Sequence, residues 1–250
     1  MGGSNTGGGM SGGGNMGKGN MCQGVPSYKD LKAALDLAVT QDTSNLNLGM
    51  WATVVNRDGY VCAVAFSGAD RNAQWPASRV ISAQKANTAN SLSLDGLALS
   101  TANLYSAVQG TSSVSPLGGS LYGLQFSNPV DPAVAYRGKP TDYGTAKDPM
   151  INGRIGGVNV FGGGLGLYND KDRIIGGVGV SGDTSCRDHM VAWHIRHNLK
   201  LDNLKSVGGV AGDPKHPDNM IFSTTGSTTG WEHPDCGPGT TDPATLPAVM

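Results

Sequence analysis

The sequence predicts a single α+β domain, because two hairpin patterns alternate with segments of helical spacing. Residues 51–66 and 165–180 each hold two runs of strand-forming residues around a short turn, which is typical of antiparallel strands. Residues 27–41, 77–93 and 184–198 have the patterns or capping residues of helices. A length of 250 residues suits one large domain or two small ones, and we expect one.

The first helix is predicted over residues 27–41. Ser27 stands at its N-cap, and Asp30 three residues later gives a weaker version of the capping box. Apolar residues then recur at helical spacing, at Tyr28, Leu31, Leu35 and Ala38. The helix should end near Gln41.

Two strands follow as a hairpin over residues 51–56 and 60–66. Both runs are rich in β-branched and aromatic residues. Residues 57–59 form the turn between them, with Gly59 at the position that needs a positive φ. The antiparallel pairing of these two strands is therefore expected.

Two further helices are expected before the middle of the chain, at residues 77–93 and 97–108. The first of them carries many small side chains, which permit close helix packing. In the second half, strands are predicted at residues 158–161, 165–168 and 173–180, with a turn at 169–172. Thr184 or Ser185 caps the next helix, which runs to about residue 198 and has Asp188 near its positive end.

The predicted organisation is a domain over residues 22–206 between two irregular ends. Residues 1–21 form a Gly/Met-rich tail whose composition cannot offset its ordering entropy alone. Residues 110–155 are rich in Gly, Pro, Ser and Asp and are too long for an ordinary connection, so we interpret them as an inserted functional or subunit-contacting loop. Residues 207–250 form an irregular extension, with at most a short strand at 220–223.

The charge of the chain argues against two classes of partner. A formal net charge of −1 gives no electrostatic footprint for nucleic acid or for acidic lipid.

No apolar run approaches the roughly eighteen residues needed to span a bilayer, so no membrane insertion is expected. No secretory signal is visible in the chain.

Four cysteines form an even set, at Cys22, Cys62, Cys186 and Cys236, and allow three pairings. We favour Cys22 with Cys62, which pins the segment before the first helix to a strand, and Cys186 with Cys236, which ties the C-terminus to the histidine-bearing helix. Disulfides imply an oxidising compartment, so a periplasmic or secreted location is predicted. Reduced buried thiols in a cytosolic protein are the alternative.

A zinc site is a further alternative for two of these cysteines. Cys186 and His189 form a C-x2-H pair, and His233 and Cys236 form an H-x2-C pair, which together offer four ligands for tetrahedral zinc. Cys186 and His189 lie one helical turn apart and can point the same way.

The run from Gly177 to Gly182 matches the dinucleotide pattern G-x-G-x-x-G, and Asp202 follows twenty residues later. A dinucleotide-binding domain needs this pattern on the first strand of a parallel unit, with more strands and helices after it. Only irregular sequence remains after the helix at residues 184–198. The strand that carries the glycines, at residues 173–180, pairs through a tight turn with the strand at 165–168 and is therefore antiparallel to it. We therefore exclude NAD or FAD.

The chain resembles the GlcG/HbpS-like family over roughly residues 27–200. Residues 82–89, SAQKANTA, are similar to its K-A-x-T-A helix, and Gly162-Gly-Gly164 with IIGGVGVSGDTSCRDH is similar to its triple glycine and G-A-I-G-V-S-G-x-T-x-x-x-D signature. The matching positions are Lys85, Thr88, Gly162, Gly163, Gly164, Gly182, Thr184 and Asp188. The chain departs from the family in having Leu165 where a proline commonly follows the glycines, in the 110–155 loop, and in the cysteine-bearing extension.

The resemblance implies a central antiparallel sheet flanked by helices, with profilin-like layering, and assembly as a homo-oligomer. It also implies haem binding, since some members bind haem while others have no established activity. The chain has no C-x-x-C-H motif, so covalent attachment is excluded and any haem is held noncovalently.

His189 is the candidate ligand of the haem iron, because it lies in the first turn of its helix beside a glycine strand that a flat ligand can approach closely. Its alternative role is a hydrogen bond to a neighbouring loop. Lys85 is a candidate partner for a ligand carboxylate, and Thr88 can hydrogen-bond the same ligand. The complete predicted cofactor site is His189, Lys85, Thr88, Gly162, Gly163, Gly164 and Asp188.

Other candidates are given lesser roles. His194 and His197 are expected to face solvent, and His216 and His233 lie in Pro-flanked loops, where histidines are most often structural or exposed. The aromatic side chains of Trp75 and Tyr122 offer flat walls, but aromatic residues next to loops are more often core anchors.

The sequence therefore favours a noncovalent haem-binding protein in haem sequestration, sensing or support of a redox pathway. Two alternatives stay open. One is an enzyme acting on a small oxygenated metabolite through Lys85, Asp188 and His189 in the same pocket, although no catalytic motif identifies a reaction. The other is a structural self-assembling protein whose tail and long loop join subunits.

Overall fold

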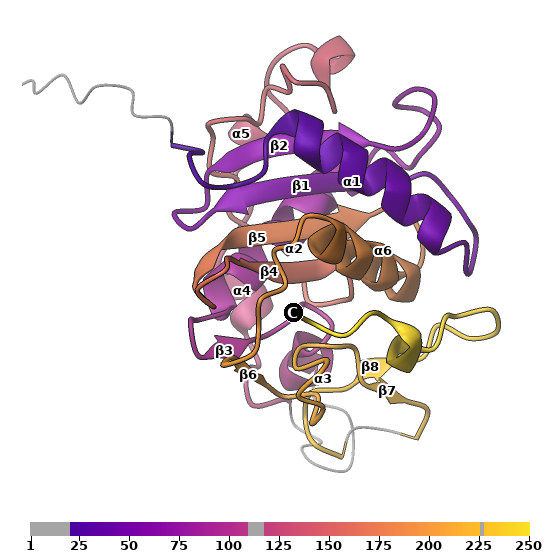
Figure 1. The fold of residues 1–250 in the computed structure, drawn as a ribbon. Coiled ribbons are helices and arrows are strands. Elements are labelled where there is room, and N and C mark those ends of the chain that lie inside the picture. Colours follow the sequence, from indigo (N-terminus) through magenta and orange to yellow (C-terminus); the bar gives the residue numbers. More distant parts are fainter. Residues whose placement is uncertain (1–20, 110–117, 226–227) are drawn as a thin grey trace, which may run out of the picture.

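A computed structural model describes residues 21–109, 118–225 and 228–250 of the chain. Its centre is a four-stranded sheet with the order β2-β1-β5-β4 (Figure 1). The strands are β1 (Trp51–Asn56), β2 (Val61–Phe66), β4 (Gly164–Tyr168) and β5 (Ile174–Ser181). All three pairings between them are antiparallel, so the predicted α+β class is confirmed.

Three long helices flank the sheet. The helices α1 (Tyr28–Gln41) and α6 (Ser185–Asn198) lie together on one face, and α2 (Ser78–Leu92) covers the other (Figure 1). A large apolar core fills the space between the sheet and α1 with α6, and a smaller core lies between the sheet and α2. This is the layering that the resemblance implies.

Short elements complete the fold. They are β3 (Leu97–Ala98), α3 (Leu104–Gln109), α4 (Leu124–Ser127), α5 (Pro132–Ala135), η1 (Pro140–Asp142), β6 (Gly208–Gly209), β7 (Phe222–Ser223), β8 (His233–Pro234) and η2 (Pro243–Thr245). The described part of the 110–155 loop contains α4, α5 and η1, and Figure 1 shows α5 near β2 at the edge of the sheet.

The predicted helix caps and turns are present. Ser27 and Asp30 form a complete capping box at α1, and the Thr184 side chain caps α6 by accepting from the Arg187 amide. Gly59 has the positive φ expected of the first hairpin, at 78°. Local sequence signals therefore place the main elements correctly.

The helix predicted at residues 97–108 is wrong over its first half. The segment begins as β3, which pairs in parallel with β6, and only α3 is helical. Between them, the Ser100 amide donates to Asn103 Oδ1 at 3.0 Å and the Asn103 amide donates to Ser100 Oγ at 3.3 Å. These side chains compete with helical hydrogen bonds and hold a turn instead.

The strand predicted at residues 158–161 is also wrong. Its backbone pairs with no strand in the described part of the chain, because side chains take that place. The Asn159 amide donates to Thr88 Oγ1 at 3.0 Å, and Phe161 O accepts from Thr101 Oγ1 at 2.7 Å. The segment therefore follows α2 without joining the sheet.

Both predicted disulfides are present, Cys22–Cys62 and Cys186–Cys236, and all four cysteines are bonded in this way. The second disulfide attaches the C-terminal extension to α6. The extension adds a fully buried ion pair between Arg196 and Asp218, with N and O 2.6 Å apart. Short strands and loops make up this region, as expected.

The strand that carries Gly177 and Gly179 lies between two antiparallel neighbours. This arrangement confirms that the glycine pattern is not a dinucleotide fingerprint. Its glycines have a packing role instead. A Cβ at Gly177 would lie 2.4 Å from Ala86 O, and one at Gly179 would lie 2.0 Å from Ser82 O, so only glycine lets α2 approach β5 this closely.

We predict that Gly179→Ala lowers the free energy of unfolding by about 3 kcal/mol, because the added methyl group forces α2 away from β5. Urea unfolding followed by circular dichroism measures the change. Gly96→Ala is the matched control, since no other group lies within 4 Å of a Cβ there. Equal stability of the two variants would contradict this account of the packing.

Candidate functional site

A buried ion pair joins the two helical layers. Lys85 on α2 and Asp188 on α6 lie on opposite faces of the sheet, yet Nζ and Oδ2 are 2.7 Å apart and both side chains are at most 1% exposed. Nζ also donates to Val180 O at 3.0 Å and lies 4.5 Å from the centre of the Phe161 ring. Asp188 Oδ1 accepts from the Asp183 amide at 3.0 Å, so both charges are well partnered.

Burial shifts the pKa values of both groups in the directions that favour their neutral forms. It raises the pKa of the Asp188 carboxyl to about 6, although the Lys85 ammonium and the Asp183 amide oppose the rise. It lowers the pKa of the Lys85 ammonium, against the attraction of Asp188. Lys85 and Asp188, which the sequence assigned to a ligand, therefore form an ion pair with each other.

The space beside the triple glycine is filled by the protein's own atoms. A Cβ at Gly162 would lie 2.2 Å from Ser185 O and 2.5 Å from the terminal methyl of Met220. One at Gly163 would lie 3.0 Å from both Lys85 Nζ and the Asp188 Cβ. These glycines make room for the ion pair and for the extension, so described residues occupy the place that the sequence assigned to a ligand.

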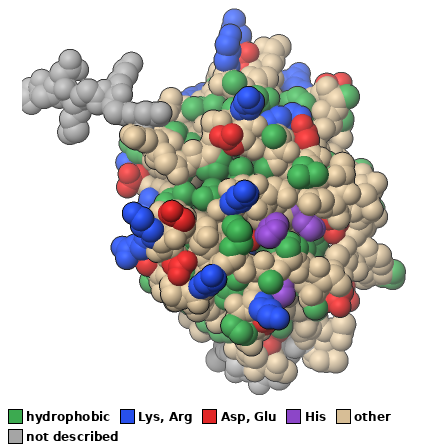
Figure 2. All heavy atoms as spheres, viewed as in Figure 1, with side chains coloured by type: hydrophobic (Ala, Val, Ile, Leu, Met, Phe, Trp, Pro, Cys, Tyr) green, Lys and Arg blue, Asp and Glu red, His purple; other side chains and the backbone are tan. Residues whose placement is uncertain are grey.

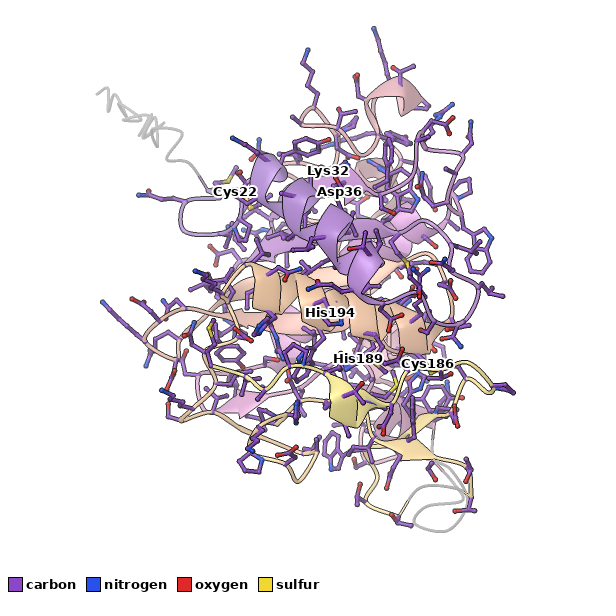
Figure 3. All side chains as sticks on the ribbon, turned by 45° about the vertical axis from the view of Figure 1, so that its right-hand side comes forward. Cys22, Lys32, Asp36, Cys186, His189 and His194 are labelled. Carbon is purple, nitrogen blue, oxygen red and sulfur yellow. A yellow bond between two sulfur atoms is a disulfide. The ribbon has the colours of Figure 1, made fainter. Side chains whose placement is uncertain are left out.

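His189 is completely buried beneath the C-terminal extension. Figure 3 shows it on α6 near Cys186 and next to the C-terminal segment. Its Nε2 lies 3.2 Å from Asn219 Oδ1 and 3.2 Å from the Met220 amide nitrogen, while Nδ1 has no partner among the described residues. Burial lowers the pKa of His189 to about 3, so the ring is neutral. This contact is the loop hydrogen bond named as the alternative role.

The structure brings most of the predicted cofactor site together. Lys85, Asp188 and Gly163 are in contact, a Cβ at Gly162 would lie 3.0 Å from the His189 Cβ, and one at Gly164 would lie 2.6 Å from Lys85 O. Thr88 lies one turn further along α2. Thr88 Oγ1 donates to Gln84 O at 2.8 Å and accepts from the Asn159 amide. The assignment of these residues to haem stays a prediction.

The remaining histidines lie where expected, but the two aromatic residues do not. His194 and His197 are partly exposed, and Figure 2 shows histidine over α6 among interspersed positive and negative side chains. His216 and His233 are both buried and hydrogen-bonded, which is the structural role. The expectation that Trp75 and Tyr122 are core anchors is wrong, since their side chains are exposed by 49% and 66%.

The zinc alternative is not supported. Cys186, His233 and Cys236 do cluster, with their potential ligand atoms within 4.8 Å of one another. However, the two sulfur atoms are joined in a disulfide, so neither is a thiolate that can bind zinc. His189 faces Asn219 instead of this cluster.

A cavity that the sequence did not indicate lies between the start of α2 and the inserted loop. Its volume is about 360 Å³. We call it the tyrosine cavity; its lining includes Trp51, Arg71, Pro76, Ala77, Tyr136 and Tyr143. The contributing segments are far apart in the chain and follow no shared motif, so sequence spacing gave no signal for it. Only the concentration of tyrosines in the loop could have drawn attention.

With the fold and these sites defined, comparison with known proteins identifies the family. Residues 27–195 match the family described as haem degrading protein HbpS-like. The match spans more than half of the chain, and the chain belongs to this family. The comparison with curated proteins gave no significant match.

Two solved structures are similar to the chain. One is a Klebsiella pneumoniae protein, ORFY, at 26% identity and a TM-score of 0.45, covering 68% of this chain and 86% of that one. The other is a PduOC:haem complex at 22% identity and a TM-score of 0.44, covering 69% of this chain and 94% of that one. In the described part of the chain, no helix has the length and apolar character to cross a bilayer.

The Lys85–Asp188 pair can be tested with a double-mutant cycle. We predict that Lys85→Met lowers the free energy of unfolding by about 3–5 kcal/mol, because it leaves Asp188 buried without a cation. Added to Asp188→Asn, the same change should cost much less. Chemical unfolding of the three variants measures the coupling, and additive costs would show that the two groups do not depend on each other.

The buried His189 should make stability depend on pH. Its folded-state pKa of about 3 lies below the unfolded value near 6.5, so the unfolded chain takes up a proton first as the pH falls. This contribution to stability is complete above pH 6.5 and is lost below it. We predict that the wild type loses about 2–3 kcal/mol more than His189→Gln between pH 7 and pH 4.5 in urea unfolding. An equal loss of unfolding free energy in both proteins would contradict a buried, neutral His189.

Proposed function

We propose that this chain binds haem noncovalently. The observation that carries the proposal is the match of residues 27–195 to a family described by its action on haem. The cysteines support the noncovalent mode, because all four are in disulfides and none is available for a thioether to a haem vinyl group.

The role we propose is haem sequestration, haem sensing or support of a redox pathway in the periplasm or outside the cell. The two disulfides support this location, since they are stable in an oxidising compartment. Assembly as a homo-oligomer belongs to the same proposal.

The triple-glycine site does not fit a bound haem in this conformation. Met220 and the α6 backbone occupy the space beside Gly162, and Asn219 faces His189. Iron coordination by His189 would require these residues of the extension to move.

Haem degradation is a second candidate, favoured by the description of the family. The metabolite alternative has less support, because Lys85 and Asp188 neutralise each other inside the protein. Ascorbate and dioxygen added to the haem-loaded protein separate binding from degradation. A Soret band that decays faster than that of free haem supports degradation, and a stable band supports binding alone.

Titration with haem tests the proposal directly. We predict a shifted Soret band that saturates at one equivalent per chain, because a specific site holds one haem in one environment. The control is the same chain unfolded in urea with its disulfides intact, which should give no saturable shift. An identical response of folded and unfolded chains would overturn the proposal.

A further inference from the structure

We propose that the tyrosine cavity binds a flat aromatic molecule that carries a carboxylate. The proposal concerns a site on the α2 face of the sheet, at the start of β1, and not the triple glycine. Its volume of about 360 Å³ falls within the range of about 300–1,000 Å³ typical of small-molecule sites. Its lining combines aromatic rings with an arginine, which indicates the chemistry of the ligand.

The rings that line the cavity favour a planar ligand. Trp51, Tyr136 and Tyr143 supply rings from β1 and from the inserted loop, and Pro76 and Ala77 supply a small apolar edge. Aromatic rings pack well against other flat rings in offset or edge-on arrangements. Tyr136 is 61% exposed, so its ring offers unused apolar surface at the rim.

The floor and walls of the cavity are held in place before any ligand arrives. Arg79 is buried, pairs with Asp148 on the loop, and lies 3.6 Å from the centre of the Tyr143 ring. The Trp51 indole donates to Trp75 O at 3.0 Å and packs on Phe66 with ring centres 5.3 Å apart. A preorganised site loses little entropy on binding.

The charge of the cavity favours an anion. Arg71 lies exposed in the lining, and its guanidinium has no hydrogen bond or ion pair to the described residues. The cavity also borders the start of α2, but the amides of its first turn already donate to backbone carbonyls, namely Ser78 to Trp75 O, Arg79 to Pro76 O and Val80 to Ala77 O. The charge offered to a ligand therefore comes from Arg71. Arg79 does not add to this charge, because Asp148 neutralises it.

The inference rests on the proposed function only in naming the natural ligand, since haem is a flat aromatic molecule with two carboxylates. If the chain binds haem, the tyrosine cavity would hold one face and edge of the porphyrin while the rest extends into solvent. This placement needs no movement of the C-terminal extension. It also assigns a role to the inserted loop, which supplies Tyr136 and Tyr143.

Metal-free protoporphyrin IX is the probe that tests the cavity, read by the fluorescence of the porphyrin itself. We predict that Ala77→Trp, which fills the cavity, and Arg71→Glu, which reverses its charge, each weaken binding at least tenfold. Ala146→Trp and Lys147→Glu are matched controls, since both positions are exposed on the inserted loop and neither lines the cavity. The controls and His189→Ala should bind within twofold of the wild type.

Each outcome separates this inference from the proposed function. Binding of protoporphyrin IX without any binding of haem would leave the cavity in place and overturn the haem proposal. Haem binding that Ala77→Trp and Arg71→Glu do not weaken would overturn the cavity, and a loss confined to His189→Ala would place the ligand at the triple glycine. Circular dichroism and thermal melting verify that each variant is folded, and Arg71→Glu decides the result if Ala77→Trp is not.

Discussion

The ion pair between Lys85 and Asp188 is the interaction on which the layered structure depends. It connects α2 on one face of the sheet to the first turn of α6 on the other, past the end of β5. Two opposite charges without solvent are tolerated only with good geometry and further hydrogen bonds, and the Val180 carbonyl and the Asp183 amide supply them. Gly163 leaves the space through which the pair meets. The matching family positions thus have a structural explanation that requires no ligand.

Two segments that we interpret as additions to the family pattern lie on two sides of that centre. The inserted loop closes over the start of α2 through Arg79 and Asp148 and so builds one wall of the tyrosine cavity. The C-terminal extension covers α6 through Arg196 and Asp218, and it places Met220 against Gly162. The inserted loop therefore helps to form a cavity for small molecules, whereas the C-terminal extension covers the region where the sequence alone predicted a ligand.

The sequence predicted most features that depend on neighbouring residues, although it missed the local turn that Ser100 and Asn103 hold. The capping box of Ser27 and Asp30, the hairpin turn at Gly59 and the cap at Thr184 are local, and all are present. It failed where side chains distant in the chain decide the outcome, as when Thr88 and Thr101 take the hydrogen bonds of the segment near Asn159.

The candidate site shows the same division. Lys85 and Asp188 were found because they fall in recognisable motifs, but a motif does not tell whether two charges face a ligand or each other. The closure over His189 comes from residues about thirty positions later, whose loop has no periodic pattern. The tyrosine cavity combines segments from β1, α2 and the loop, and such a combination is visible only in three dimensions.

The order of the disulfides has a consequence for biogenesis. The first cysteine pairs with the second and the third with the fourth, so the two covalent loops do not cross. A chain delivered N-terminus first to an oxidising compartment presents its thiols in that same order. An oxidase that joined each thiol to the next one to emerge would form both native bonds directly, with no reshuffling step.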